Sequence, residues 1–115
     1  MDYNCQTTDT RLAKLQLAFD SLREMDREMP GQVVSAFLFI ASHDGCHLQA
    51  LTDELGLETA SRSRITCWLS DYHRLGKPGL GLITKTEDPA NRRRKVLRLT
   101  NKGKALANQF KEAAA

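Results

Sequence analysis

Apolar residues along this chain follow two spacings, a helical one through most of the sequence and a strand-like alternation in its C-terminal third. In residues 10–29 they recur at steps of three and four, as on one face of an α-helix. Residues 31–45 are apolar nearly all round, which predicts a mostly buried helix after the stop at Pro30 and Gly31. The first part of the chain is therefore expected to be helical.

The segment of residues 10–29 carries a narrow apolar stripe, and Asp9 or Thr10 is available to cap its start. The stripe consists of Leu12, Leu15, Phe19 and Leu22. A helix of this kind packs either on its own core or against a copy of itself. Because these side chains exceed what one short partner helix can cover, we expect a homodimer formed through this helix and the last one.

Two further helical patterns are separated by a very short turn, which is typical of a helix-turn-helix. Residues 48–55 place their leucines on one face and end at Gly56, a residue suited to a helix C-terminus. The next helix is predicted within residues 57–76, with the hydroxyl of Thr59 or Ser61 as its N-cap.

The second of these helices has two different faces when its residues are placed at about 100° intervals. The apolar back consists of Ile65, Trp68, Leu69 and Tyr72, so we expect Trp68 to be structural. The front carries small polar side chains edged by cations, namely Arg62, Ser63, Arg64, Thr66, Cys67, Ser70 and Arg74. Such a front lets the backbone of a DNA duplex approach closely.

Strand-like alternation appears in residues 82–88 and 95–100, which predicts two antiparallel strands joined by the loop DPANRRR. This hairpin loop is expected to hold out four consecutive cations, which are Arg92, Arg93, Arg94 and Lys95. Residues 46–48 can add one short strand. A last helix is predicted at about residues 101–112, with inward side chains at Ala105, Leu106 and Phe110.

The predicted fold class is mainly α with a small antiparallel β-hairpin, a winged helix-turn-helix in a single domain over residues 1–115. The distribution of charge along the chain indicates a class of binding partner. Residues 1–57 carry four Lys/Arg against nine Asp/Glu, a net of −5, whereas residues 58–104 carry twelve against four, a net of +8. A contiguous basic half is typical of a surface that binds phosphates.

Other compositional features indicate where the protein works. Three cysteines, an odd number at irregular spacing, favour a reducing cytoplasm over a disulfide framework. The longest apolar run, at residues 36–41, is far too short to cross a membrane, and the N-terminus has no apolar core of a signal peptide. We therefore expect a cytoplasmic protein with no membrane partner.

Two motifs resemble the signature of the MarR family of bacterial transcription regulators. They are the wing DPANRR at residues 88–93 and the segment LTNKG at residues 99–103. Three departures accompany the resemblance, which covers about residues 10–112. Asn91 stands where the family usually has aspartate, the link GKPGLG is longer than usual, and the C-terminus stops about one helix short.

The resemblance implies a homodimeric regulator of double-stranded DNA, a repressor without a cofactor. Ser63, Thr66 and Ser70 would face bases or phosphates in the major groove, while Arg62 and Arg64 grip the backbone or a guanine edge. The wing arginines would reach the flanking minor groove. Family members often bind phenolic ligands near the dimer interface, which implies a small aromatic effector in a shallower pocket here.

Other chemistry is less well indicated. His43, Cys46 and His47 are metal-binding residue types, but the second pair that zinc needs would be Cys67 and His73, on different faces of one helix. The sequence shows no catalytic constellation and no P-loop context, which indicates that the protein is not an enzyme.

Two alternatives stay open. Cys67 is either an oxidation-sensitive thiol beside arginines or a small side chain that lets DNA approach. The alternative function is a winged helix whose basic wing binds an acidic protein surface.

Overall fold

The computed structural model describes residues 9–71 and 78–115, which form five α-helices and three strands. The helices are α1 (Thr10–Met25), α2 (Gly31–Ser42), α3 (Gln49–Leu55), α4 (Thr59–Leu69) and α5 (Asn101–Ala114). The strands are β1 (Cys46–His47), β2 (Ile83–Asp88) and β3 (Asn91–Leu99), and they form an antiparallel sheet in the order β1-β3-β2. The predicted fold class is confirmed, because this is the element order of a winged helix-turn-helix.

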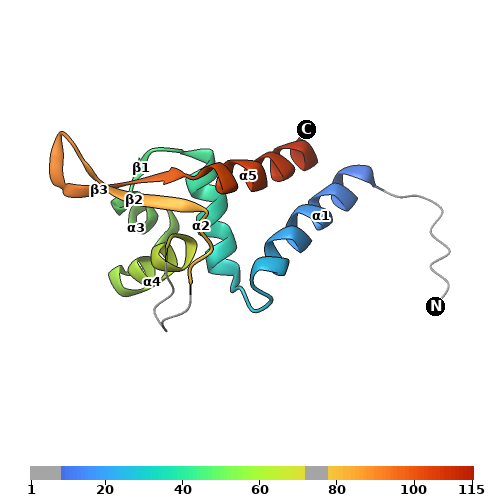
Figure 1. The fold of residues 1–115 in the computed structure, drawn as a ribbon, viewed down its shortest axis with the longest axis horizontal. Coiled ribbons are helices and arrows are strands. Elements are labelled where there is room, and N and C mark those ends of the chain that lie inside the picture. Colours follow the sequence, from blue (N-terminus) through green and yellow to red (C-terminus); the bar gives the residue numbers. More distant parts are fainter. Residues whose placement is uncertain (1–8, 72–77) are drawn as a thin grey trace.

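Figure 1 shows α1 and the tip of the β2–β3 hairpin at opposite ends of the molecule, with α2 between them. The hydrophobic core is built around α2, whose Phe37 and Ile40 are fully buried. Leu51 of α3, Ile65 of α4 and Leu97 of β3 are buried in the same cluster. The helix-turn-helix and the sheet are therefore held to one core. No helix in the described part of the chain is long and apolar enough to span a bilayer.

The start of α1 is fixed by Asp9, whose carboxylate accepts hydrogen bonds from the backbone N–H groups of Arg11 and Leu12 at 2.9 and 3.2 Å. The helix ends at Met25, earlier than predicted, because Asp26 adopts an extended backbone. Asp26 also accepts a 2.9 Å hydrogen bond from Nε1 of Trp68. Trp68 is half-buried and packs against the core, as its structural assignment requires.

Helix α5 packs against α1, and the rings of Phe19 and Phe110 meet edge to face with centroids 5.4 Å apart. Leu106, Ala107 and Phe110 are buried, whereas Ala105 is exposed, so the inward placement predicted for Ala105 is wrong. A shift of one residue on a helix turns a side chain by about 100°, and Ala107 takes the inward position instead.

The segment LTNKG joins β3 to α5 through two contacts of small groups. The Thr100 hydroxyl caps α5 by accepting from the Gly103 N–H at 3.0 Å, and it donates to the Gly81 carbonyl at 2.6 Å. A Cβ atom added at Gly103 would overlap the carbonyl oxygen of Leu82. This motif therefore sets how closely α5 approaches the chain that leads into β2.

Candidate nucleic-acid interface

Helices α3 and α4 are joined by a turn that begins at Gly56, which has a positive φ of 70° and ends α3. Helix α4 begins at Thr59 after Glu58, whose side chain makes no capping hydrogen bond. The predicted caps Thr59 and Ser61 are wrong, because both residues lie inside the helix. The first turn of α4 thus keeps backbone N–H groups that its own side chains do not cap.

The outward stripe of α4 comprises Ala60, Ser63, Arg64 and Cys67, which recur at helical steps of three and four. Ala60, Ser63 and Arg64 are exposed, and Cys67 is half-buried. The predicted positions of Ser63 and Arg64 on the outer face are consistent with this stripe. Ala60 was missed in the sequence because an apolar alanine gives no polar signal, although its spacing from Ser63 and Arg64 would have revealed it.

Arg62 lies beside this stripe but is held by the preceding helix. Its Nη1 donates to Gln49 Oε1 at 3.0 Å and to Thr52 Oγ1 at 3.1 Å, both on α3. Its Nε is buried without a hydrogen-bond partner among the described residues. The guanidinium therefore joins α4 to α3 and is not free to extend toward a base edge, which the sequence interpretation had allowed.

Thr66 was expected on the DNA-facing side, and this prediction is wrong because the residue is fully buried. Its hydroxyl lies near the carbonyl oxygens of Arg62 and Ser63 in its own helix, at 2.9 and 3.1 Å. The same oxygen accepts a 3.3 Å hydrogen bond from Nζ of Lys85 on β2. Bonding back to its own helix lets a hydroxyl be buried without losing its partners.

Ser70 lies just past the end of α4, where it is half-buried and its hydroxyl donates to the Cys67 carbonyl at 3.2 Å. The backbone of residues 79–82 runs beside this end of the helix. Its N–H groups donate to the carbonyls of residues 68–71 at 2.8–3.0 Å and so satisfy the last turn. The predicted extension of the helix toward Gly76, and Arg74 and His73 with it, falls in residues 72–77, outside the described residues.

The four cations were predicted in the hairpin loop, but the structure places Arg92, Arg93, Arg94 and Lys95 within β3. The turn consists of Pro89 and Ala90 alone, and Asp88 pairs with Asn91 across it. The next pair in the register is Glu87 with Lys95, so residues 92–94 form an insertion in β3 beside an irregularity of β2. The prediction of a loop is therefore wrong, although three of the cations lie outside the regular ladder.

The turn of the wing is held by two short polar side chains, one on each side of Pro89 and Ala90. Asp88 accepts hydrogen bonds from the Ala90 N–H and from His47 Nε2, both at 2.9 Å. The His47 hydrogen bond, followed by that of Ala90, lowers the pKa of the Asp88 carboxyl from its ordinary value. Asn91 accepts a hydrogen bond from the Arg93 N–H at 3.1 Å, so its amide still fixes the local turn at the position where the MarR-like signature has aspartate.

Arg62 of α4 and the cations Arg93, Arg94 and Lys95 of β3 line one pocket of about 210 Å³. Helix α4 and the wing therefore meet in a single basic surface. Arg92, Arg93 and Arg94 are exposed, and Lys95 forms a 3.5 Å ion pair with Glu87. A rigid helix beside a basic hairpin is an arrangement that can hold phosphates and present side chains to a groove.

The apolar stripe of α1 is divided between the core and the surface. Leu22 is buried within the protomer, and Phe19 is half-buried against Phe110, so the prediction that both form a dimer interface is wrong for Leu22. Leu15 is half-buried and packs against the core, whereas Leu12 is 64% exposed. Leu17, which was not among the residues predicted for the dimer interface, is 66% exposed.

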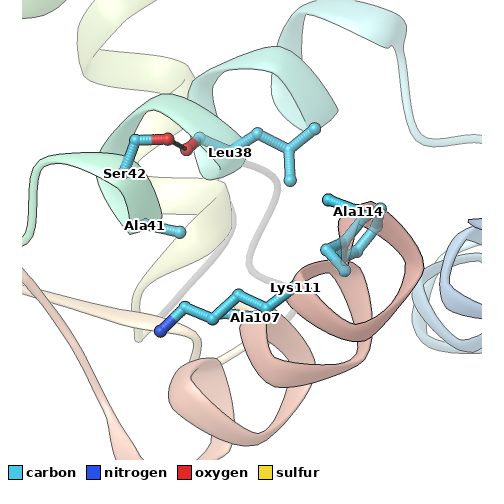
Figure 2. A pocket seen from close by; sticks show the side chains of 7 residues that line it. Leu38, Ala41, Ser42, Ala107, Lys111 and Ala114 are labelled. Carbon is cyan, nitrogen blue, oxygen red and sulfur yellow. Dashed lines mark hydrogen bonds between the residues drawn. The ribbon is translucent and has the colours of Figure 1, made fainter.

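A second pocket, of about 190 Å³, lies between α2 and α5. Figure 2 shows Leu38 of α2 pointing toward Ala114 of α5, while the side chain of Lys111 extends along the α5 wall. Ser42, also on the α2 side, donates its hydroxyl hydrogen to the Leu38 carbonyl at 2.8 Å. The remaining lining is apolar, so the pocket suits a small apolar or aromatic molecule with one anionic group.

The residues considered for metal binding are His43, Cys46, His47 and Cys67 in the described part of the chain, and His73 outside it. Within the described ranges, no three His, Cys, Asp or Glu side chains are placed to hold a metal ion. Cys46 and Cys67 are free thiols, and burial raises the pKa of the Cys46 thiol. Cys46 is paired with Leu97 in the sheet and belongs to the structural part of the molecule.

No protein-family model matches the chain, and no curated protein matches it. Its fold is similar to several solved structures. A MarR transcriptional regulator from Methanosarcina mazei Go1 superposes with a TM-score of 0.64 at 21% identity, over 91% of this chain and 69% of that one. The transcriptional repressor CouR, bound to a 23-mer DNA duplex, gives a TM-score of 0.61 at 23% identity, over 90% and 69% of the two chains.

The PcaV transcriptional regulator from Streptomyces coelicolor, in complex with its natural ligand, is also similar. It gives a TM-score of 0.60 at 21% identity, over 99% of this chain and 77% of that one. The shared element order and these superpositions lead to one conclusion. The chain has the winged-helix fold of MarR-type transcriptional regulators.

Proposed function

We propose that the protein is a sequence-specific, double-stranded DNA-binding transcriptional regulator that acts as a homodimeric repressor in the cytoplasm. The observation that carries the proposal is the single basic surface formed by α4 and the wing. A helix fixed to the core and flanked by the exposed arginines of the wing meets the two needs of DNA recognition, which are phosphate contacts for position and side chains for base edges.

The outward stripe of α4 supplies the reading side chains in this proposal. Arg64 donates to a guanine edge or a phosphate, and Ser63 contacts a base or a phosphate beside it. Ala60 leaves room for close approach, and Ser70 contacts the backbone at the far end. The wing arginines Arg92, Arg93 and Arg94 bind the flanking minor groove and its phosphates, with Lys95 at their base.

The repressor assignment is supported by the likeness to CouR, whose solved structure contains a DNA duplex. A homodimer is supported by the exposed Leu12 and Leu17 of α1, which a second copy would cover. Two protomers would then present two α4 helices to successive half-sites of one operator.

A small aromatic effector is a further part of the proposal, supported by the pocket between α2 and α5 (Figure 2). Its volume of about 190 Å³ exceeds the roughly 150 Å³ of an engineered cavity that takes up benzene. The ammonium group of Lys111 supplies a countercharge for a carboxylate or phenolate. PcaV, whose structure contains its natural ligand, gives the fold-level precedent.

The proposal is tested by selecting duplexes from a random-sequence pool with the purified full chain. A DNA-binding regulator enriches one motif, and that duplex competes far better than a shuffled duplex of the same length and composition. If selected and shuffled duplexes compete equally, sequence-specific regulation is wrong. Binding to an acidic protein surface through the wing then becomes the better account of the basic half.

A further inference from the structure

The basic pocket between the helix-turn-helix and the wing has walls from four elements. Its polar lining comes from His47 of β1, Gln49 of α3, Arg62 of α4, and Arg93, Arg94 and Lys95 of β3. Its volume of about 210 Å³ is several times the roughly 30 Å³ share of one water molecule in the liquid. A phosphate group with one or two waters therefore fits between these walls.

The walls are fixed relative to one another by hydrogen bonds. Arg62 is held to α3 through Gln49 and Thr52, and Gln49 is itself oriented by a 3.2 Å bond to Asp53. The Leu48 N–H donates to the Lys95 carbonyl at 2.9 Å and so joins the two sides of the pocket. A preformed site of this kind loses little conformational entropy when it binds an anion.

The charges of the pocket are poorly compensated within the part of the chain that the structure describes. Arg62, Arg93 and Arg94 form no ion pair there, and Lys95 shares its charge with Glu87. Among the described residues, no carboxylate lines the pocket itself. Three arginines around one opening, none of them in an ion pair within the described residues, call for an anionic ligand.

His47 adds a proton-dependent donor to this set. Its Nε2 lies 2.9 Å from Asp88, and an ionised carboxylate only accepts hydrogen bonds, so Nε2 carries a hydrogen. A neutral imidazole has only that one N–H, whereas an imidazolium can also donate from Nδ1. The groups that face His47 are Asp88 from β2, Arg62 from α4, and Arg93, Arg94 and Lys95 from β3.

We infer that this pocket binds one backbone phosphate of the DNA in each half-site, with His47 donating to it as an imidazolium. The inference rests on the proposed function and adds a pH dependence to it. Because Nε2 already donates to Asp88, the ring donor that remains for a phosphate is Nδ1, which carries a hydrogen only in the imidazolium. DNA binding by the protein is therefore coupled to proton uptake at His47.

The test measures duplex affinity of the full chain at constant ionic strength between pH 5.5 and 8. Wild type should lose affinity as the pH rises, by up to tenfold per pH unit and protomer where one proton is taken up. His47→Gln should lose this dependence, so that its affinity relative to wild type is lowest at pH 5.5 and rises toward pH 8. His43→Gln removes an exposed histidine outside the pocket and should keep the wild-type dependence.

A duplex series with one neutral methylphosphonate at each backbone position gives a readout that needs no protein variant. Substitution at one position per half-site should abolish the His47-dependent part of the pH profile and leave the others unchanged. If wild type and His47→Gln share the same profile while both bind the selected duplex, the inference is wrong and the proposed function stands.

NMR of the His47 ring resonances distinguishes a DNA phosphate from free inorganic phosphate as the ligand of the pocket. A shift caused by duplex, and not by millimolar inorganic phosphate, supports the DNA backbone as ligand. A shift caused by inorganic phosphate in a protein that binds no duplex overturns both the inference and the proposed function, and assigns the pocket to a free anion.

Discussion

A single hydrogen atom at position 103 decides how α5 meets the rest of the domain. Gly103 is buried in the first turn of α5, directly against the carbonyl of Leu82. Alanine normally stabilises a helix relative to glycine by roughly 0.5–1 kcal/mol. At this position the added methyl group would instead push α5 away from the start of β2.

We expect Gly103→Ala to lower the free energy of unfolding by about 1–3 kcal/mol, because the overlap is with backbone that cannot rotate away. The control is Gly31→Ala at the start of α2, where an added Cβ has nothing within 4 Å. That change should be neutral or stabilise by up to about 1 kcal/mol in urea denaturation. Equal behaviour of the two variants would contradict the close approach at Gly103.

Asp88 gives the wing a dependence on acid. Its folded pKa is lowered, chiefly by the hydrogen bond from His47, so its contribution to stability is present above the ordinary aspartate range near pH 4. The contribution is lost as the pH falls through the lowered value. We expect Asp88→Asn to unfold at lower urea than wild type at pH 7, with the difference closing toward pH 2–3.

The matched change for Asp88→Asn is Glu54→Gln, at an exposed carboxylate of α3. It should show a much smaller difference from wild type at both ends of the pH range. A difference for Asp88→Asn that stays constant from pH 7 down to pH 2 would show that the charge of Asp88 is not the cause.

Single-residue roles were harder to predict than positions on a helix face. Ser63 and Arg64 were placed on the outer face of α4 from spacing alone, and the structure agrees. The same spacing also placed Thr66 and Arg62 on this side, but Thr66 is buried and Arg62 is bound to α3, because contacts with other elements decide their positions. Lys85 on β2 and Gln49 on α3 decide where those side chains point, and no local pattern encodes such contacts.

At the scale of elements, the sequence pattern located each helix and strand of the described residues but not every boundary. The end of α4 was missed because the stop comes from residues 79–82, which lie beside its last turn. The extent of β3 was missed because the cationic run interrupts the alternation without ending the strand. A three-residue insertion in one strand breaks the two-residue alternation, so the alternation does not reveal that the strand continues.

The wing can be tested as an element through the salt dependence of DNA binding. Each lost phosphate contact lowers the slope of log affinity against log salt by about 0.9. Arg92→Ala combined with Arg93→Ala should therefore reduce the slope by up to roughly 4 in a dimer, with nearly equal weakening of all sequences.

The control for the wing removes the same charge elsewhere, with Arg27→Ala combined with Lys104→Ala, at exposed positions in the turn after α1 and on α5. It should leave the slope within about one unit of wild type, since these cations lie outside the proposed interface. An unchanged slope in the wing variant would indicate that these cations bind a protein partner and not DNA.

At the scale of the whole molecule, α1 carries an exposed apolar surface. Leu12 and Leu17 are the large apolar side chains that the described residues leave exposed. Fully burying a leucine contributes roughly 1.5–3 kcal/mol, so two copies of this surface can stabilise a dimer.

We expect Leu12→Asp combined with Leu17→Asp to sediment as a folded monomer, because neither side chain belongs to the protomer core. Gln32→Asp combined with Ser35→Asp adds the same charge at exposed positions of α2 and should keep the wild-type mass. A wild-type protein that sediments as a monomer at high micromolar concentration would contradict the proposed assembly.

The burial of Thr66 and the anchoring of Arg62 have a consequence for protein engineering. Within α4, the residues that hold the scaffold are separate from those that face outward. A library that randomises Ala60, Ser63 and Arg64 while keeping Arg62 and Thr66 would change what the helix presents without loosening its attachment to α3 and β2. The outward face of α4 can therefore be changed independently of the scaffold, and new target sequences can be sought by varying three codons within one short stretch of the gene.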